Sequence, residues 1–251
     1  MSERVLLLHS SGISSRQWRK LESTLARSCE VLAPDLLGYG RSGVWPPGKP
    51  FHFREDVARL EQLIGSGPVH VVGHSYGGML ALKLALRRAE QVRSLALFEP
   101  VAFRALDAER DADALAELAP MGGFDPADAG AGEAWVSQFV NWWSGEGSWS
   151  RLPEESRASF LASAWKCSQE ATSLMEDPEG AEAYRAIRAP TLLLTGARSP
   201  MPARRVAARL AAAIPGARHV EFEGVSHMGP ITHPALVNAA ILDNLNLGNL
   251  R

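Results

Sequence analysis

Short apolar runs alternate along the chain with segments in which apolar residues recur every three or four positions. A short continuous apolar run is typical of a strand that is buried on both faces of a parallel sheet. Apolar residues at helical spacing indicate helices that cover such a sheet. Six runs predict strands: Val5–Leu8, Val31–Ala33, Val69–Val72, Val92–Phe98, Thr191–Gly196 and His219–Phe222.

Helical spacing is clearest in five segments between and after these runs. They are Trp18–Leu25, Arg54–Ile64, Met79–Leu86, Val206–Ile214 and Pro234–Leu245. Strands that alternate with helices favour right-handed crossovers and a sheet that is covered on both faces. The predicted fold class is therefore α/β, with a mostly parallel sheet of about six strands flanked by helices.

The alternation is interrupted between Phe98 and Thr191. Residues 101–189 are rich in alanine, acidic residues and short helical stretches, and they are too many for a plain loop. We interpret them as a helical lid inserted over the functional site, with residues 1–100 and 190–251 as the α/β core. Most tryptophans of this segment are expected to pack inside the lid. The adjacent Trp142 and Trp143 cannot face one way on a helix, so one of them is expected to line a pocket.

The motif Gly73-x-Ser75-x-Gly77 stands directly between the run Val69–Val72 and the helix that contains Met79. A serine in a tight strand-to-helix turn exposes its hydroxyl, and the glycines leave room for neighbouring backbone. The N-terminus of the following helix favours negative charge beside the serine. The alternative is a glycine-rich turn with an incidental serine. At these residues the chain resembles the α/β-hydrolase family, whose nucleophile lies at such a turn.

The resemblance implies a catalytic histidine and two oxyanion donors. The family order of nucleophile, acid and histidine points to His227, in the loop after the last strand, as the base. The backbone N–H of Tyr76 would bind the oxyanion, and the family's His-Gly-x turn matches His9-Ser10-Ser11, which gives the second N–H to Ser11. Ser10 departs from the usual glycine. A polar loop without a catalytic role is the alternative there.

The acid is where the sequence departs most from the family pattern. That pattern has an aspartate a few residues beyond the strand that ends at Gly196, but Ala197–Pro202 contains no carboxylate and Ser199 stands in its place. Glu99 stands at the end of Val92–Phe98, the strand that follows the helix containing Met79. It is predicted as the substitute acid. The alternatives are Glu223, a dyad without an acid, or Glu99 as a structural strand end. Asp35 is interpreted as a turn-forming residue in its own loop.

Composition narrows the partners. Hydrophobic residues make up 46% of the 251 residues, charged residues make up 22%, and the net charge is −2. These values suit one globular domain and argue against a nucleic acid or an anionic membrane as partner. Only the four apolar residues Val5–Leu8 precede the first polar loop, which is too short for a signal peptide or a membrane span. The cysteines Cys29 and Cys167 fit reduced thiols in a cytoplasmic protein.

The sequence contains no dinucleotide fingerprint and no metal-ligand spacing, so no cofactor and no metal are expected. We interpret the chain as a serine hydrolase that cleaves an ester or lactone of a small, mainly apolar substrate through an acyl-enzyme. The predicted pocket contains Trp142, Trp143 and Met228. The alternatives are a carbon–carbon bond (diketone) hydrolase, other α/β-hydrolase chemistry, and a ligand-binding protein on the same fold. A homodimer remains open, and Ser75 disfavours relatives that use an aspartate nucleophile.

Overall fold

An open sheet of six parallel strands forms the centre of the molecule, in the order β2-β1-β3-β4-β5-β6. The computed structural model describes residues 3–118 and 122–245. The strands are β1 (Glu3–Leu8), β2 (Cys29–Leu32), β3 (Val69–His74), β4 (Val92–Phe98), β5 (Thr191–Gly196) and β6 (Arg218–Phe222). The predicted fold class is confirmed, and every strand pair of the sheet is parallel.

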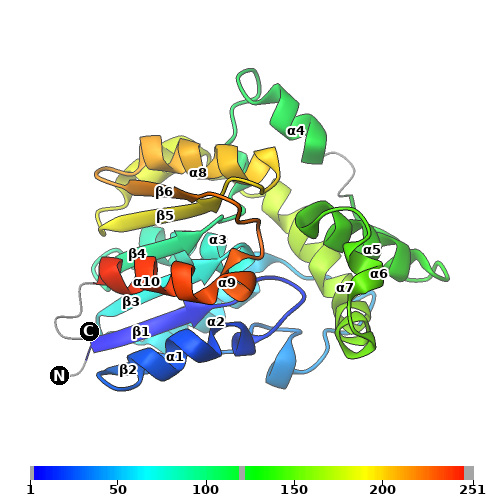
Figure 1. The fold of residues 1–251 in the computed structure, drawn as a ribbon, viewed down its shortest axis with the longest axis horizontal. Coiled ribbons are helices and arrows are strands. Elements are labelled where there is room, and N and C mark those ends of the chain that lie inside the picture. Colours follow the sequence, from blue (N-terminus) through cyan, green and yellow to red (C-terminus); the bar gives the residue numbers. More distant parts are fainter. Residues whose placement is uncertain (1–2, 119–121, 246–251) are drawn as a thin grey trace.

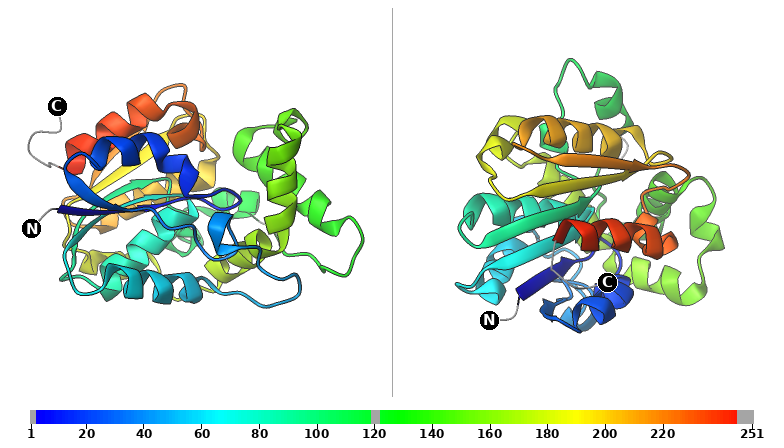
Figure 2. Two further views of the ribbon diagram at one scale, coloured as in Figure 1. Left: turned by 90° about the horizontal axis from the view of Figure 1, so that it is seen from below. Right: turned by 60° about the vertical axis from the view of Figure 1, so that its left-hand side comes forward.

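Helices cover both faces of the sheet (Figures 1 and 2). The α-helices are α1 (Arg19–Leu25), α2 (Phe53–Ile64), α3 (Tyr76–Arg87), α4 (Ala112–Leu118), α5 (Ala131–Ser144), α6 (Ser148–Arg151), α7 (Glu154–Met175), α8 (Met201–Ala213), α9 (Gly229–Thr232) and α10 (Pro234–Leu245). One buried cluster joins α1 and α10 to one face, through residues such as Leu21 and Ile241. A second cluster joins α2, α3 and α8 to the other face.

The apolar pattern located the elements but not all of their ends. Strand β2 begins at Cys29 rather than at Val31, and β3 continues to His74, directly before Ser75. The predicted helix from Trp18 begins one turn earlier, because a 3₁₀ turn over Ser15–Trp18 leads into α1. The short helix α9, which follows the loop of His227, was not predicted. Its four residues are too few to show helical spacing.

Burial along the strands explains which runs were easiest to recognise. All six residues of β3 and all six of β5 are buried, because neighbours cover them on both sides. Strand β6 lies at the sheet edge, and four of its five residues are exposed. An edge strand has one face and one side in water, which allows its polar residues.

The segment between β4 and β5 contains α4, α5, α6 and α7. Figure 1 shows α5, α6 and α7 together beyond one end of the sheet. Their apolar side chains, among them Val136 and Val140, belong to the same buried cluster as those of α3. Of the ranges predicted for core and lid, residues 1–2, 119–121 and 246–251 lie outside the described residues.

Two further features concern the chain as a whole. Over the described ranges, 3–118 and 122–245, the structure has no helix that is both long and apolar enough to span a membrane. Cys29 is partly buried, Cys167 is buried, and both are free thiols.

Candidate functional site

Ser75 lies alone in the turn between the end of β3 and the start of α3. Its φ of 55° and ψ of −118° are strained for a residue with a side chain. A Cβ atom on Gly73 would lie 2.5 Å from the carbonyl oxygen of Gly77, and one on Gly77 would lie 2.4 Å from that of Leu8. Both positions therefore require glycine, and the tight turn predicted from the motif is present.

Glu99 and His227 form a buried hydrogen-bonded pair. The Nδ1–H of His227 donates to Oε2 of Glu99 at 2.6 Å, and both side chains are almost fully buried. Glu99 directly follows β4 and has a φ of 45°; of the described residues other than glycine, it shares positive φ with Ser75 alone. Because Glu99 accepts a hydrogen bond from Nδ1–H, the proton of the neutral imidazole stays on Nδ1. Nε2 is then unprotonated and can accept a proton. Strained backbone at these two strand ends marks the site.

Ser199 and Gly196 hold the other oxygen of Glu99. The Ser199 hydroxyl donates to Oε1 at 2.6 Å and the N–H of Gly196 donates at 2.7 Å. Ser199 stands where the family pattern has its acid, so the residue in that position here supports the carboxylate of Glu99. The rival Glu223 is exposed and makes no hydrogen bond to His227 among the described residues. Sequence reasoning missed the role of Ser199, although its position in the motif was the signal.

Two aromatic rings hold the imidazole of His227. Trp143 of α5 stacks on it with ring centroids 3.6 Å apart and planes inclined by 24°. The ring of His74 lies 4.9 Å away, and its Nε2–H donates to the carbonyl oxygen of His227 at 2.8 Å. His74, which lies inside the Gly73-x-Ser75-x-Gly77 motif, therefore anchors the loop that carries His227.

The hydroxyl of Ser75 and the ring of His227 line one cavity. The structure has no hydrogen bond between Ser75 and any described side chain. In enzyme structures without substrate, a hydrogen bond between a nucleophile and its base is often long and tightens only in the complex. Met228, also predicted as a pocket residue, lines the same cavity.

The two N–H groups predicted as oxyanion donors are available. Tyr76 is the first residue of α3, and the N–H groups of a first helical turn have no acceptor within the helix. Among the described residues, none accepts a hydrogen bond from the N–H of Ser11. Ser11 also lines the cavity that contains Ser75.

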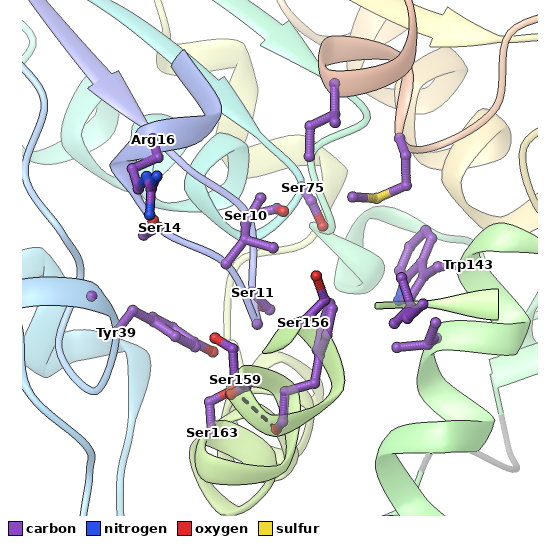
Figure 3. Close-up of a pocket in the computed structure, with 18 of the residues that line it drawn as sticks. Ser10, Ser11, Ser14, Arg16, Tyr39, Ser75, Trp143, Ser156, Ser159 and Ser163 are labelled. Carbon is purple, nitrogen blue, oxygen red and sulfur yellow. Dashed lines mark hydrogen bonds between the residues drawn. The ribbon is translucent and has the colours of Figure 1, made fainter. Parts of the chain in front are cut away.

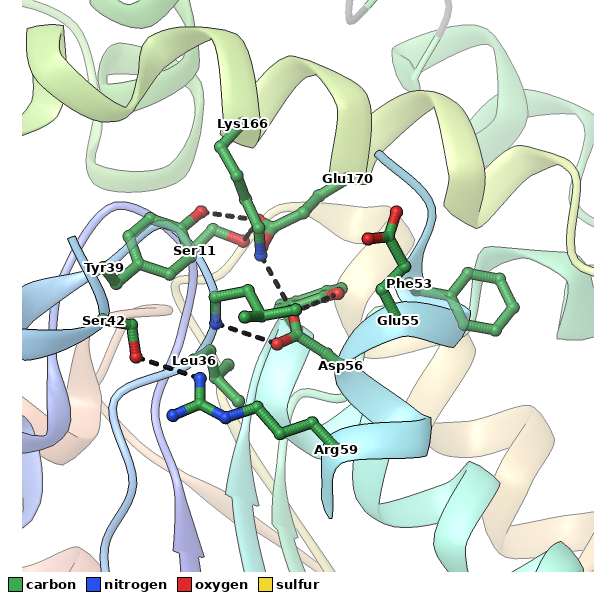
Figure 4. Close-up of polar contacts among 12 residues, drawn as sticks. Ser11, Leu36, Tyr39, Ser42, Phe53, Glu55, Asp56, Arg59, Lys166 and Glu170 are labelled. Atoms are coloured by element: carbon green, nitrogen blue, oxygen red, sulfur yellow. Dashed lines mark hydrogen bonds and ion pairs between the residues drawn. The ribbon is translucent and has the colours of Figure 1, made fainter. Parts of the chain in front are cut away.

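A buried charge network connects Ser11 and Tyr76 to α7. Figure 4 shows its members Ser11, Asp56, Lys166 and Glu170. The Ser11 hydroxyl donates to Glu170 at 2.5 Å, and the Tyr76 hydroxyl donates to Asp56 at 3.0 Å. The ammonium of Lys166 bridges the two carboxylates. Burial raises the pKa of Glu170, although Lys166 opposes that shift. Sequence reasoning missed this network. Its one local signal is the i, i+4 spacing of Lys166 and Glu170, which is common on any helix.

His9 and Asp35 shape the loop that carries Ser11. Nε2 of His9 accepts the N–H of Leu36 at 3.0 Å, and burial lowers the pKa of His9 to about 4. Burial would raise the pKa of Asp35, but hydrogen bonds from the N–H groups of Arg41 and Ser15 outweigh it and lower this pKa to about 2. Asp35 thus has the turn-forming contacts expected of it.

Stability should fall in mild acid because His9 and His74 are buried in the neutral form. The pKa of His9 is about 4 in the folded chain and about 6.5 when unfolded, so the unfolded chain binds more protons between these values. The contribution of neutral His9 to the free energy of unfolding is therefore present above pH 6.5 and is lost as the pH falls. Protonation of His9 alone should lower the free energy of unfolding by about 2 kcal/mol between pH 7 and pH 4.5. Burial also lowers the pKa of His74, with the same sign. Urea unfolding across this range measures the loss, and a His9 ring that titrates near pH 6.5 by NMR would contradict it.

Two cavities open at Ser75 in the described part of the chain. The larger, of about 1310 Å³, is the serine cavity; its lining includes Ser10, Ser14, Ser156, Ser159 and Ser163 and also His227 (Figure 3). The smaller, of about 490 Å³, is the apolar cavity; its lining includes Val101, Phe103, Leu118, Phe139 and Leu174.

The predicted pocket tryptophans both reach these cavities. Trp143 lines the serine cavity and the apolar cavity, and Trp142 lines the apolar cavity. Helix geometry required only one of the two to face a pocket, although both were predicted as pocket residues. The two rings pack edge to face with centroids 4.5 Å apart. Adjacent residues of α5 therefore both line the apolar cavity. Within residues 3–118 and 122–245, no group of three or more histidine, cysteine or carboxylate side chains is arranged to hold a metal ion.

The fold and site define a class of protein: a parallel α/β sheet with a strained serine elbow at the carboxyl end of a central strand. The sequence matches the alpha/beta hydrolase family over residues 5–240. The chain belongs to the alpha/beta hydrolase family.

Relatives of known function are similar to parts of the chain. Lipase LipV of Mycobacterium tuberculosis is 41% identical over 135 residues, which are 52% of this chain and 49% of the lipase. A haloalkane dehalogenase of Bradyrhizobium diazoefficiens is 36% identical over 98 residues, 38% of this chain and 31% of that protein. The matches span about half the length of the lipase and less of the dehalogenase.

Solved structures resemble the whole chain. A hydrolase from Pseudomonas aeruginosa PA01 has a TM-score of 0.75 at 25% identity, over 98% of this chain and 90% of that one. The enol-lactonase from Burkholderia xenovorans LB400 has a TM-score of 0.73 at 21% identity, over 98% and 92%. At that identity the second likeness concerns the fold alone.

Proposed function

We propose that the protein is a serine hydrolase that cleaves a carboxylic ester or lactone. The observation that carries the proposal is the buried 2.6 Å hydrogen bond from His227 to Glu99, at a cavity that also contains the hydroxyl of Ser75. A base oriented by a carboxylate beside a serine on a strained elbow is the arrangement that nucleophilic acyl transfer requires. The lipase among the relatives supports the ester class.

Attack begins at the Ser75 hydroxyl. Its oxygen bonds to the substrate carbonyl carbon while Nε2 of His227 takes its proton. The oxyanion accepts hydrogen bonds from the N–H groups of Ser11 and Tyr76, and one such donor is worth roughly 3–4 kcal/mol in the transition state. The side-chain bond from Ser11 to Glu170 fixes the loop that carries one donor.

The acyl-enzyme then forms and is hydrolysed. The tetrahedral intermediate collapses, and the His227 imidazolium gives its proton to the leaving oxygen. Glu99 stabilises that imidazolium without taking its proton. Water, activated by the same histidine, attacks the acyl carbon, and the acid leaves as Ser75 recovers its proton.

We also propose that residues 101–189 act as the lid and residues 1–100 and 190–251 as the core. Side chains of α5 and α7 line the cavities at Ser75, which supports a covering role. The stacking of Trp143 on His227 means that the lid completes the surroundings of the proposed base. A small-molecule substrate suits these cavities, and the net charge of −2 argues against nucleic acid as a partner.

Activity-based labelling tests the proposal. A fluorophosphonate should label the folded protein stoichiometrically, and mass spectrometry should locate the adduct on Ser75. Ser75→Ala should not label, whereas Ser137→Ala, which removes an exposed hydroxyl on α5, should label like the unaltered protein.

The same preparation distinguishes the alternatives. Turnover of short-chain esters or lactones with labelling at Ser75 supports the ester class. Labelling together with turnover of diketones alone would favour carbon–carbon cleavage. Folded protein that neither labels nor turns over any of these substrates, yet binds one tightly, would overturn the proposal in favour of a binding protein.

A further inference from the structure

The two cavities that meet at Ser75 differ in chemistry. In the serine cavity, serine is the commonest lining residue, and most of these hydroxyls come from the loop after β1 and from α7 (Figure 3). Apolar residues such as Ile13 and Phe160 lie between them. The apolar cavity is lined mainly by aliphatic and aromatic side chains from the segment between β4 and β5. A substrate bound across Ser75 would therefore place one end in each environment.

The position of His227 decides which end goes where. The histidine must deliver its proton to the leaving oxygen, so the leaving group has to lie on the His227 side of Ser75. His227 lines the serine cavity and does not line the apolar cavity. The leaving alcohol therefore belongs in the serine cavity and the acyl group in the apolar cavity.

Some hydroxyls in the serine cavity have no hydrogen-bond partner among the described residues, whereas those of Ser11 and Ser163 are bonded. Ser10 is only 4% exposed, and its hydroxyl makes no hydrogen bond to a described residue. It stands where the family pattern has glycine, and Figure 3 shows it at the cavity that contains Ser75. Ser156, which is partly buried, and Ser159, which is exposed, line the cavity from α7, and neither hydroxyl makes a hydrogen bond to a described residue. Each hydroxyl can donate one hydrogen bond and accept others, so the wall suits a ligand with several hydroxyls.

Charge at the cavity does not favour an anion. Arg16, Arg19 and Arg151 contribute to the lining, but so do Glu22 and Glu155. Arg41 is also present and is paired with Asp35 at 3.2 Å. A neutral leaving group matches this near balance better than a phosphate or carboxylate does.

We propose that the substrate is an ester of an apolar acid with a neutral, hydroxyl-rich alcohol such as glycerol or a sugar. This inference rests on the proposed function. The apolar cavity of about 490 Å³ binds the acyl group, and the serine cavity of about 1310 Å³ binds the alcohol. The volume of the serine cavity leaves room for an alcohol larger than glycerol, such as a sugar.

Matched esters test the assignment. Glycerol monobutyrate should be hydrolysed with a kcat/KM at least about 10-fold above that of hexyl glycerate, which carries its hydroxyls on the acid instead. The double variant Ser156→Ala/Ser159→Ala should lower kcat/KM for glycerol monobutyrate about 10-fold, the effect of two hydrogen bonds. It should leave butyl butyrate within about twofold, and Ser137→Ala should leave both substrates unchanged.

Each outcome separates this inference from the proposed function. Hydrolysis of the esters without a preference, with a preference for hexyl glycerate, or with equal losses on both butyrates in the double variant would overturn the assignment and leave the serine hydrolase standing. A preference for a butyryl glycerol phosphate over glycerol monobutyrate would overturn the neutral class. Absence of both turnover and fluorophosphonate labelling would instead defeat the proposed function.

Discussion

Glu99→Gln should fold normally and lose turnover by about 10⁴-fold, the scale known for an amide in place of a triad acid. The N–H of Gly196 and the hydroxyl of Ser199 would still require an oxygen at the Oε1 position. The new NH₂ group would then occupy the Oε2 position and face Nδ1 of His227. The imidazole would adopt the tautomer with the proton on Nε2, which cannot accept the proton of Ser75. Steady-state kinetics on a butyrate ester measures the loss.

Two control variants concern Glu223, the rival acid, and position 199, where the family pattern has its acid. Glu223→Gln should retain activity within about twofold, because Glu223 is exposed and makes no hydrogen bond to His227. Combining Glu99→Gln with Ser199→Asp should recover part of the activity. In the unaltered protein, the Ser199 side chain contacts the Glu99 carboxylate, so an aspartate at position 199 would place a carboxylate close to that site. Near-normal turnover by Glu99→Gln, with unchanged thermal unfolding, would exclude Glu99 as the acid and leave a dyad or Glu223.

Gly77→Ala should destabilise the folded chain by at least about 3 kcal/mol. The added methyl carbon would lie 2.4 Å from the carbonyl oxygen of Leu8 and 2.5 Å from that of His9, so backbone has to move. Helix α3 and the end of β1 would separate, and Ser75 would leave its strained turn. Urea unfolding gives the change in stability, and labelling by fluorophosphonate reports the position of Ser75.

Gly122→Ala is the matched control for that substitution. No heavy atom lies within 4 Å of the Cβ built there, and its backbone is not in the left-handed region. Its stability should stay within about 0.5 kcal/mol of the unaltered protein. Unfolding of Gly77→Ala at the same urea concentration as Gly122→Ala would mean that α3 can shift freely and that the elbow does not depend on this close approach.

The candidate site was partly readable from the sequence because some of it is local. The elbow around Ser75 occupies five consecutive residues whose glycines have a steric reason, and His227 follows a recognisable last strand. Glu99 was predicted as the acid because no carboxylate stands near Ser199. Glu99 and His227 are separated by 128 positions in the sequence, so no local pattern could indicate that they are in contact.

By itself, the sequence determined the order of strands and helices, the parallel sheet and the strained serine turn, because burial on both faces and steric room leave short-range patterns. Tertiary structure alone decided the support of Glu99 by Ser199, the stacking of Trp143 on His227, and the bridge through Lys166. It also decided that a cavity rich in serine and a more apolar cavity meet at Ser75. Such contacts depend on where distant segments meet, and a chain pattern with a period of two or four residues carries no information about that meeting.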